Sequence, residues 1–202
     1  MPFRTIIFDL GRTLVPFSFD PLRPRLAPCM EQAQPLLLRA ETGELGPRDF
    51  QRAMCALTGV PPAEFPPWWN SIFGAAWLIP PGWIRRLLAS RRVGLLSNTN
   101  ALHYEFLLRE RPLLRDFAFR IASHEAGAAK PDPRIYAAAE AAAQCGPHEI
   151  LYLDDIPAFV EAARARGWQA EVFTGSAPLA ASLEARGETD LAAALRAAPP
   201  AD

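Results

Sequence analysis

Polar residues follow three short apolar runs of the sequence, and their types could bind a cation and a phosphate together. Asp9 follows the first run, Ser97 and Asn98 follow the second, and Asp154 and Asp155 follow the third. Ligands of parallel sheets bind at the carboxyl ends of the strands. Carboxylate oxygens suit Mg²⁺, and hydroxyl and backbone N–H groups suit phosphate oxygens. These run ends therefore favour one cation-dependent, phosphate-handling site.

Lys130 adds a positive charge to this set of acids. It lies in a loop after another apolar run, at 119–122, and before a helix pattern. Three carboxylates in one crevice would raise each other's pKa unless cations neutralised them. One lysine and one divalent ion together balance Asp9, Asp154 and Asp155, so we predict Mg²⁺ as the cofactor. A lone acid after a strand is often only a helix cap, but three coincident sites with Lys130 favour a shared site.

The elements that must position these residues alternate between apolar runs and helix patterns. The runs are short and nearly continuous, as in strands that are buried on both faces of a parallel sheet; they span 5–8, 93–96, 119–122, 150–153 and 170–173. Helix patterns lie between them, with a proline at the first position and a glycine after the end in several cases. The alternation predicts an α/β fold with a doubly wound parallel sheet.

The stretch 16–79 breaks this alternation. It contains many prolines, no convincing strand, and helical patches over 48–57 and 67–77. We therefore predict a small helical cap at 16–79, inserted after the first strand, an α/β core made of 1–15 and 80–197, and a tail at 198–202. Its aromatic residues are expected to form the core of the insertion rather than a ligand cage; they are Trp68, Trp69, Phe73 and Trp77.

Composition narrows the class of protein. The formal net charge of the 202 residues is -1, which gives no reason to expect nucleic acid or an anionic membrane as partner. The cysteines are Cys29, Cys55 and Cys145, without metal-site spacing, and are expected to be reduced thiols. No stretch of about 18 apolar residues exists, and no signal peptide fits. We expect a cytoplasmic protein, either a monomer or a homodimer.

Four segments, in order, resemble the motifs of the haloacid dehalogenase (HAD) superfamily. They read IIFDLGRTL at 6–14, LLSNTN at 95–100, AKPDPRIY at 129–136 and YLDD at 152–155. The resemblance spans nearly the whole chain and is strongest to the capped branch that contains bacterial sugar-1-phosphate phosphatases. It implies a HAD-like Rossmannoid core in which a helical cap closes over the site.

The resemblance also implies a role for each matched residue. Asp9 corresponds to the nucleophile, Ser97 with Asn98 to the phosphate-binding segment, and Lys130 to the residue that stabilises the charged intermediate. Asp154 and Asp155 correspond to the metal-binding acids. The metal would also accept the carboxylate of Asp9 and the backbone carbonyl of Gly11.

Three positions depart from the family pattern. Gly11 stands where the family has a second acid that acts as general acid and base, so metal binding can survive while proton transfer is lost. Phe159 replaces an acid or amide that makes an outer metal contact. Arg12 replaces a residue that is often glycine, and it either contacts an anionic substrate or points into solvent. His103, on the helix after Ser97, could replace the proton donor, but a helix-surface or loop-bonded histidine is the favoured interpretation.

Three functions remain open. The first is a Mg²⁺-dependent phosphatase that acts on a small phosphorylated metabolite, a sugar phosphate or an acyl phosphate, through an aspartyl-phosphate at Asp9. General acid–base help is worth ~10²–10⁴-fold, so Gly11 predicts slow turnover of alkyl phosphates. The second is a phospho-ligand-binding pseudo-enzyme, because Gly11 and Phe159 weaken the motif. The third is a 2-haloacid dehalogenase, whose family members also lack the second acid, although Asp154 and Asp155 argue against it.

Overall fold

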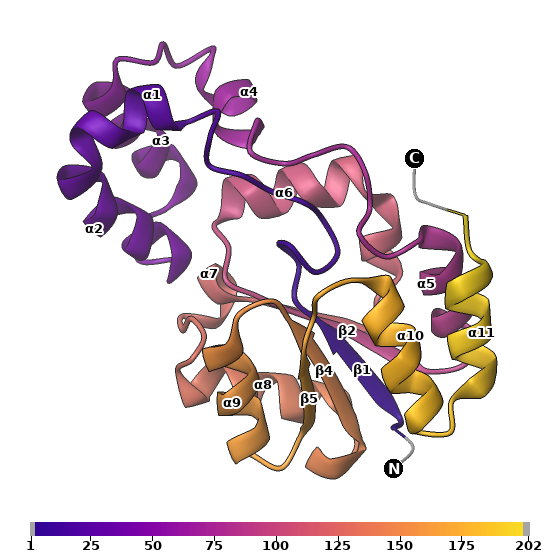
Figure 1. Cartoon of the computed structure of the whole chain (residues 1–202). Coiled ribbons are helices and arrows are strands. Elements are labelled where there is room, and N and C mark those ends of the chain that lie inside the picture. The colour runs from indigo at the N-terminus through magenta and orange to yellow at the C-terminus, as the bar shows by residue number, and fades with distance from the viewer. Residues whose placement is uncertain (1–2, 200–202) are drawn as a thin grey trace.

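A five-stranded parallel sheet forms the centre of the protein in a computed structural model that describes residues 3–199 (Figure 1). The strand order is β3-β2-β1-β4-β5. The strands are β1 Thr5–Phe8, β2 Arg92–Ser97, β3 Phe119–Ala122, β4 Ile150–Asp154 and β5 Gln169–Val172. The prediction of a doubly wound α/β fold is confirmed. Of the predicted tail, residues 200–202 lie outside the described part of the chain.

Side chains alternate between two apolar cores along the central strands, because successive residues of a strand point to opposite faces. Ile6 and Phe8 enter one core, whereas Ile7 enters the other. The first core is covered by α5 Pro81–Leu88, α6 Ala101–Glu110, α10 Ser176–Ala185 and α11 Thr189–Ala197. The second is covered by α8 Pro133–Ala143 and α9 Pro157–Ala165. Short helical turns complete the connections: η2 Pro112–Asp116, α7 Ser123–Ala126 and η3 Pro147–Glu149.

The segment 16–79, which we call the cap segment, is helical and has an apolar cluster of its own. Its elements are α1 Arg23–Leu26, η1 Ala27–Cys29, α2 Met30–Glu41, α3 Pro47–Thr58 and α4 Phe65–Asn70. They lie beyond the carboxyl ends of the strands, next to α6 and α7 (Figure 1). The division into core and cap at these boundaries stays a prediction.

One helical patch of the cap segment is shorter than predicted. The patch at 67–77 ends as a helix at Asn70, because Phe73 forms an antiparallel bridge with Phe17 and Gly74 donates its N–H to the Pro16 carbonyl. The predicted packing of the aromatic residues holds for Trp69, whereas Trp77 packs against the first sheet core. Within residues 3–199, no helix combines the length and hydrophobicity that crossing a bilayer requires.

Candidate functional site

Three acids meet at the carboxyl ends of β1 and β4. The two strands are paired with Phe8 opposite Leu153, so Asp9 and Asp154, one residue further along each strand, lie side by side. One carboxylate oxygen from each of Asp9, Asp154 and Asp155 lies within 4.8 Å of the other two. The register of the central strands therefore brings together the acids that the sequence places more than 140 residues apart.

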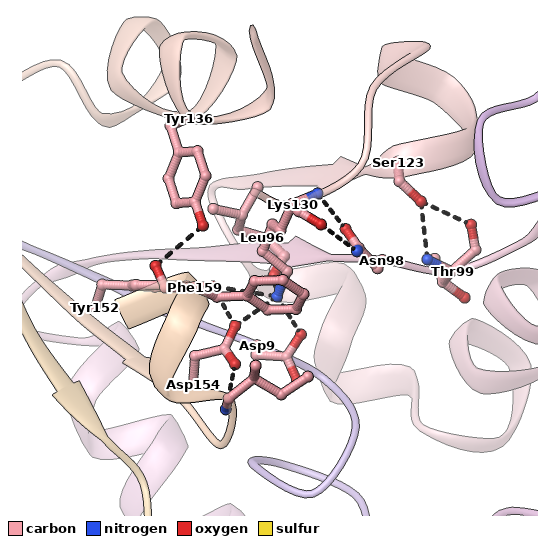
Figure 2. Close-up of polar contacts among 11 residues, drawn as sticks. Asp9, Leu96, Asn98, Thr99, Ser123, Lys130, Tyr136, Tyr152, Asp154 and Phe159 are labelled. Atoms are coloured by element: carbon pink, nitrogen blue, oxygen red, sulfur yellow. Dashed lines mark hydrogen bonds and ion pairs between the residues drawn. The ribbon is translucent and has the colours of Figure 1, made fainter. Parts of the chain in front are cut away.

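Lys130 is buried among these acids (Figure 2). Its Nζ donates to Asp9 Oδ1 at 2.7 Å and to Asp154 Oδ2 at 2.6 Å. The same nitrogen lies 3.1 Å from the Leu96 carbonyl and 3.1 Å from the Tyr152 hydroxyl. The position of Lys130 next to Asp9 is where a group must lie if it is to stabilise negative charge that develops on a phosphate there.

Burial and charge act in opposite directions on the pKa values of this site. Burial raises the pKa of Asp9 to about 6, although the charge of Lys130 lowers it, and Asp154 adds to the rise. Burial lowers the pKa of Lys130, but the charges of Asp9 and Asp154 outweigh it and the net pKa is raised. Burial and the charge of Asp154 raise the pKa of Asp155, which Arg12 partly offsets. Lys130 therefore stays charged and offsets only one of three acids.

The acids have oxygen atoms to offer to a metal ion after Lys130 is bound. Asp9 uses Oδ1 for Lys130, and Asp154 uses Oδ2 for Lys130 and for the Tyr152 hydroxyl, so Asp9 Oδ2 and Asp154 Oδ1 face other partners. Asp154 Oδ1 accepts the Ile156 N–H at 2.8 Å and keeps a second lone pair. An all-oxygen set with two uncompensated negative charges fits Mg²⁺. Gly11 stays a predicted carbonyl ligand.

Known proteins share this sequence pattern and this fold. Residues 82–167, from α5 to α9, match the family model described as haloacid dehalogenase-like hydrolase. A HAD family enzyme from Bacteroides thetaiotaomicron superposes with a TM-score of 0.76 and 23% identity, over 87% of this chain and 95% of that one. The sequence of residues 82–167 is thus similar to this family, and the fold of the chain is that of a HAD enzyme.

Two further HAD structures indicate the range of the superfamily. The Bacteroides thetaiotaomicron enzyme in complex with magnesium and inorganic phosphate has a TM-score of 0.74 and 24% identity, over 86% of this chain and 95% of that one. An L-2-haloacid dehalogenase from Xanthobacter autotrophicus, with chloropropionic acid covalently bound, has a TM-score of 0.58 and 19% identity, over 91% and 83% of the two chains. At these identities the likeness shows the fold that this chain shares with both.

Phe17 fills the space in which a side chain at position 11 would lie. A Cβ atom on Gly11 would come within 2.7 Å of Phe17 Cε1, closer than carbon atoms approach without a shift. The Arg12 guanidinium lies over the same ring, 4.9 Å from its centroid, and Arg12 has a left-handed backbone with φ 55°. Arg12 is thus held at the mouth of the site by Phe17, close enough to Asp155 to lower its pKa.

Asn98 holds the loop that carries Lys130. Its side-chain Oδ1 accepts the Lys130 N–H at 2.7 Å, and its Nδ2 donates to the Lys130 carbonyl at 3.0 Å (Figure 2). Both ends of the amide are therefore used to position Lys130, whereas the phosphate contact of Asn98 stays a prediction. Ser97, buried at the end of β2, lines a cavity next to the acids, and its phosphate contact also stays a prediction.

That cavity has a volume of about 140 Å³ and lies between the core and the cap segment. Gly11, Ser97 and His103 line it from the core, and Phe17 and Glu41 line it from the cap segment. A substrate whose phosphate lies at Asp9 would place its other groups here. The cavity therefore has room for a small molecule beside Gly11 and Ser97.

The sequence favoured a position of His103 on the helix surface or a hydrogen bond to the loop. In the structure His103 is buried, and its ring is not bonded to the loop. Its Nδ1 lies 3.0 Å from Asn70 Oδ1, and its ring stacks on Trp69 at 4.7 Å. The Asn70 amide nitrogen donates to Pro66, which leaves Oδ1 as the acceptor, so Nδ1 carries the proton. Burial lowers the pKa of His103 to about 3. His103 is therefore neutral near pH 7 and joins the cap segment to α6 instead of supplying a proton.

Two aromatic residues, Tyr152 on β4 and Phe159 on α9, lie next to the acids and Lys130. Tyr152 lies two residues before Asp154 on β4, so both side chains point to the same face, and the Tyr152 hydroxyl donates to Asp154. Burial first, then the charges of Asp154 and Asp9, raise the pKa of Tyr152 well above its usual value, so the hydroxyl stays protonated. Phe159 lies with its ring 5.0 Å from Lys130 Nζ, where the family has a polar group.

Proposed function

We propose that this HAD-like hydrolase is a Mg²⁺-dependent phosphatase of small phosphorylated metabolites. The observation that carries the proposal is the approach of Asp9, Asp154 and Asp155 to within 4.8 Å around a single buried lysine. Such a set leaves a surplus of negative charge that a divalent ion offsets, and it leaves Asp9 with an oxygen free to attack. A dehalogenase of the superfamily needs no metal, so the complete acid set supports phosphoryl transfer instead.

The proposed reaction has two steps. An oxygen of Asp9 attacks phosphorus, the bond from phosphorus to the alcohol oxygen breaks, and an aspartyl-phosphate forms. Water then attacks this phosphorus and releases inorganic phosphate and free Asp9. Lys130, at 2.7 Å from Asp9, offsets the charge on the phosphate oxygens in both steps. Bound Mg²⁺ supplies further charge stabilisation for the same oxygens.

The missing acid at Gly11 supports a restricted substrate class. No side chain at this position can protonate the departing oxygen, and Phe17 fills the space. General acid help is worth ~10²–10⁴-fold, so substrates whose leaving group needs little protonation lose least. Sugar 1-phosphates and acyl phosphates belong to that class.

The proposal is tested by a hydrolysis screen with and without Mg²⁺. The panel contains sugar 1-phosphates, sugar 6-phosphates, acetyl phosphate and an aryl phosphate, and Asp9→Asn serves as the inactive control. We expect Mg²⁺-dependent release of phosphate that EDTA abolishes and that falls steeply as the leaving-group pKa rises. Halide release from a 2-haloacid that survives EDTA would replace the proposal by a dehalogenase. Absence of any hydrolysis, with Mg²⁺ still raising Tm, would replace it by a phospho-ligand-binding protein.

A further inference from the structure

Glu41 is a carboxylate at the cavity for which the reaction above has no use. It is the last residue of α2 and lines the cavity together with Ser97 and Gly11. Burial raises its pKa, and among residues 3–199 its carboxylate forms neither a hydrogen bond nor an ion pair. A negative charge at the C-terminus of a helix is also opposed by the helix dipole. Neither packing nor local charge explains an acid at this position.

The end of α2 is fixed against the core. Gly43 follows the helix with a left-handed backbone, φ 76°, and a Cβ atom there would come within 2.1 Å of the His124 carbonyl oxygen in α7. Only a glycine permits this approach of the two backbones. Glu41, two residues earlier, is therefore held at the cavity by a direct contact between the cap segment and the core.

Several other polar groups of the cavity wall already have partners. The Asn98 amide binds the Lys130 backbone through both atoms, and Asn100 Oδ1 accepts the His103 N–H at 3.1 Å. The His103 ring is bonded to Asn70 and is neutral. Glu41 is thus the charged residue of this wall, and a cation bound in the cavity would compensate its negative charge.

An aromatic surface next to Glu41 suits the same ligand. Phe17, Phe19 and Phe73 all line the cavity, and the centroid of the Phe17 ring lies 5.4 Å from that of Phe19 and 6.4 Å from that of Phe73. The faces of aromatic rings attract cations. Phe17 already has the Arg12 guanidinium over its ring, so this surface accepts positive charge.

We propose that Glu41 and the aromatic residues Phe17, Phe19 and Phe73 bind an ammonium group on the alcohol part of the phosphomonoester. The substrate class is therefore an amino-sugar or amino-alcohol phosphate rather than its neutral counterpart. The inference rests on the proposed function, because the phosphate of the same molecule is placed at Asp9.

Two pairs of compounds test this inference, and within each pair an ammonium group replaces a hydroxyl group. The pairs are glucosamine 1-phosphate with glucose 1-phosphate, and 2-aminoethyl phosphate with 2-hydroxyethyl phosphate. We expect the wild type to prefer the ammonium member roughly tenfold or more in kcat/KM, because a hydrogen bond between charged groups is among the stronger ones. Glu41→Gln, which keeps the shape of the side chain, abolishes the preference. Glu44→Gln removes the same charge from an exposed position nearby and keeps the preference.

Calorimetric binding of the same four compounds to Asp9→Asn with Mg²⁺ separates this inference from the proposed function. If the wild type hydrolyses no phosphate but the ammonium members bind more tightly to Asp9→Asn than to its Glu41→Gln double variant, the proposed function fails and the ammonium site stands. If the members of each pair are bound and hydrolysed equally by protein with Glu41, or if the preference persists in Glu41→Gln, the ammonium site is refuted.

Discussion

Replacing Lys130 with methionine removes a buried positive charge from between two acids. The lysine side chain is 1% exposed, and those of Asp9 and Asp154 are 9% and 1% exposed. At 2.7 and 2.6 Å, each pair has a Coulomb attraction of about 6 kcal/mol for an effective dielectric constant of about 20, against several kcal/mol for desolvating each ion. Removal of one partner leaves the others uncompensated, which typically costs about 3–5 kcal/mol. We expect Lys130→Met to lose that much free energy of unfolding in EDTA.

The assay is urea unfolding of wild type and Lys130→Met, each with EDTA and with Mg²⁺. Because Mg²⁺ neutralises the same acids, we expect it to stabilise the variant and to narrow the difference from the wild type. Arg134→Met is the matched control, since Arg134 pairs with Asp132 at an exposed position and its loss should leave the free energy of unfolding nearly unchanged. Equal stability of Lys130→Met and wild type in EDTA, or a difference that Mg²⁺ leaves unchanged, would refute the idea that the acids repel one another in one site.

Three further changes give distinct results. Gly11→Asp alone should lose about 1–3 kcal/mol of unfolding free energy through overpacking against Phe17, and it should gain no activity. The double variant Gly11→Asp with Phe17→Ala should be more active on alkyl phosphates than Phe17→Ala. A Gly11→Asp single variant that is faster than the wild type and has an undiminished Tm contradicts this. Tyr152→Phe should weaken Mg²⁺ binding about tenfold in calorimetric titration, because Asp154 loses the hydroxyl that orients it, and unchanged affinity would contradict that role. His103→Gln should lower the free energy of unfolding at pH 7 and lower it less at pH 5. The buried imidazole of the wild type resists protonation down to about pH 3, so the wild type loses up to about 1.4 kcal/mol of stability per pH unit below 6.5. If the difference in unfolding free energy between the two proteins does not narrow on acidification, His103 is solvated.

The sheet and its acids could be predicted from the sequence because they depend on local pattern. Each strand is a short apolar run, and Asp9 and Asp154 lie at the ends of two of them. Parallel strands have their carboxyl ends at one edge, so the convergence of the acids follows once the runs are recognised as strands. The charge of Lys130 could be assigned to the same edge for the same reason.

Side chains that depend on the position of the cap segment could not be predicted. His103 has the sequence surroundings of a surface helix residue, but the cap segment buries it through the stacking of Trp69 on its ring and the contact with Asn70. Glu41 lies at the end of an amphipathic helix with many polar neighbours, and nothing local marks it as a cavity residue. In both cases the decisive contact joins residues more than 30 positions apart in the chain, as in the bond between His103 and Asn70.

The absence of an acid at position 11 involves Phe17 as well as Gly11, because the Phe17 ring occupies the space beside the glycine. The ring of Phe17 lies where a Cβ atom at position 11 would be and packs edge-on against the Phe73 ring, and the Arg12 guanidinium lies over it. An acid at position 11 would require the ring of Phe17 to shift. The absence of an acid at position 11 thus coincides with the placement of a ring from the cap segment, and this supports the proposal that substrates are selected by leaving groups that depart without a proton donor there.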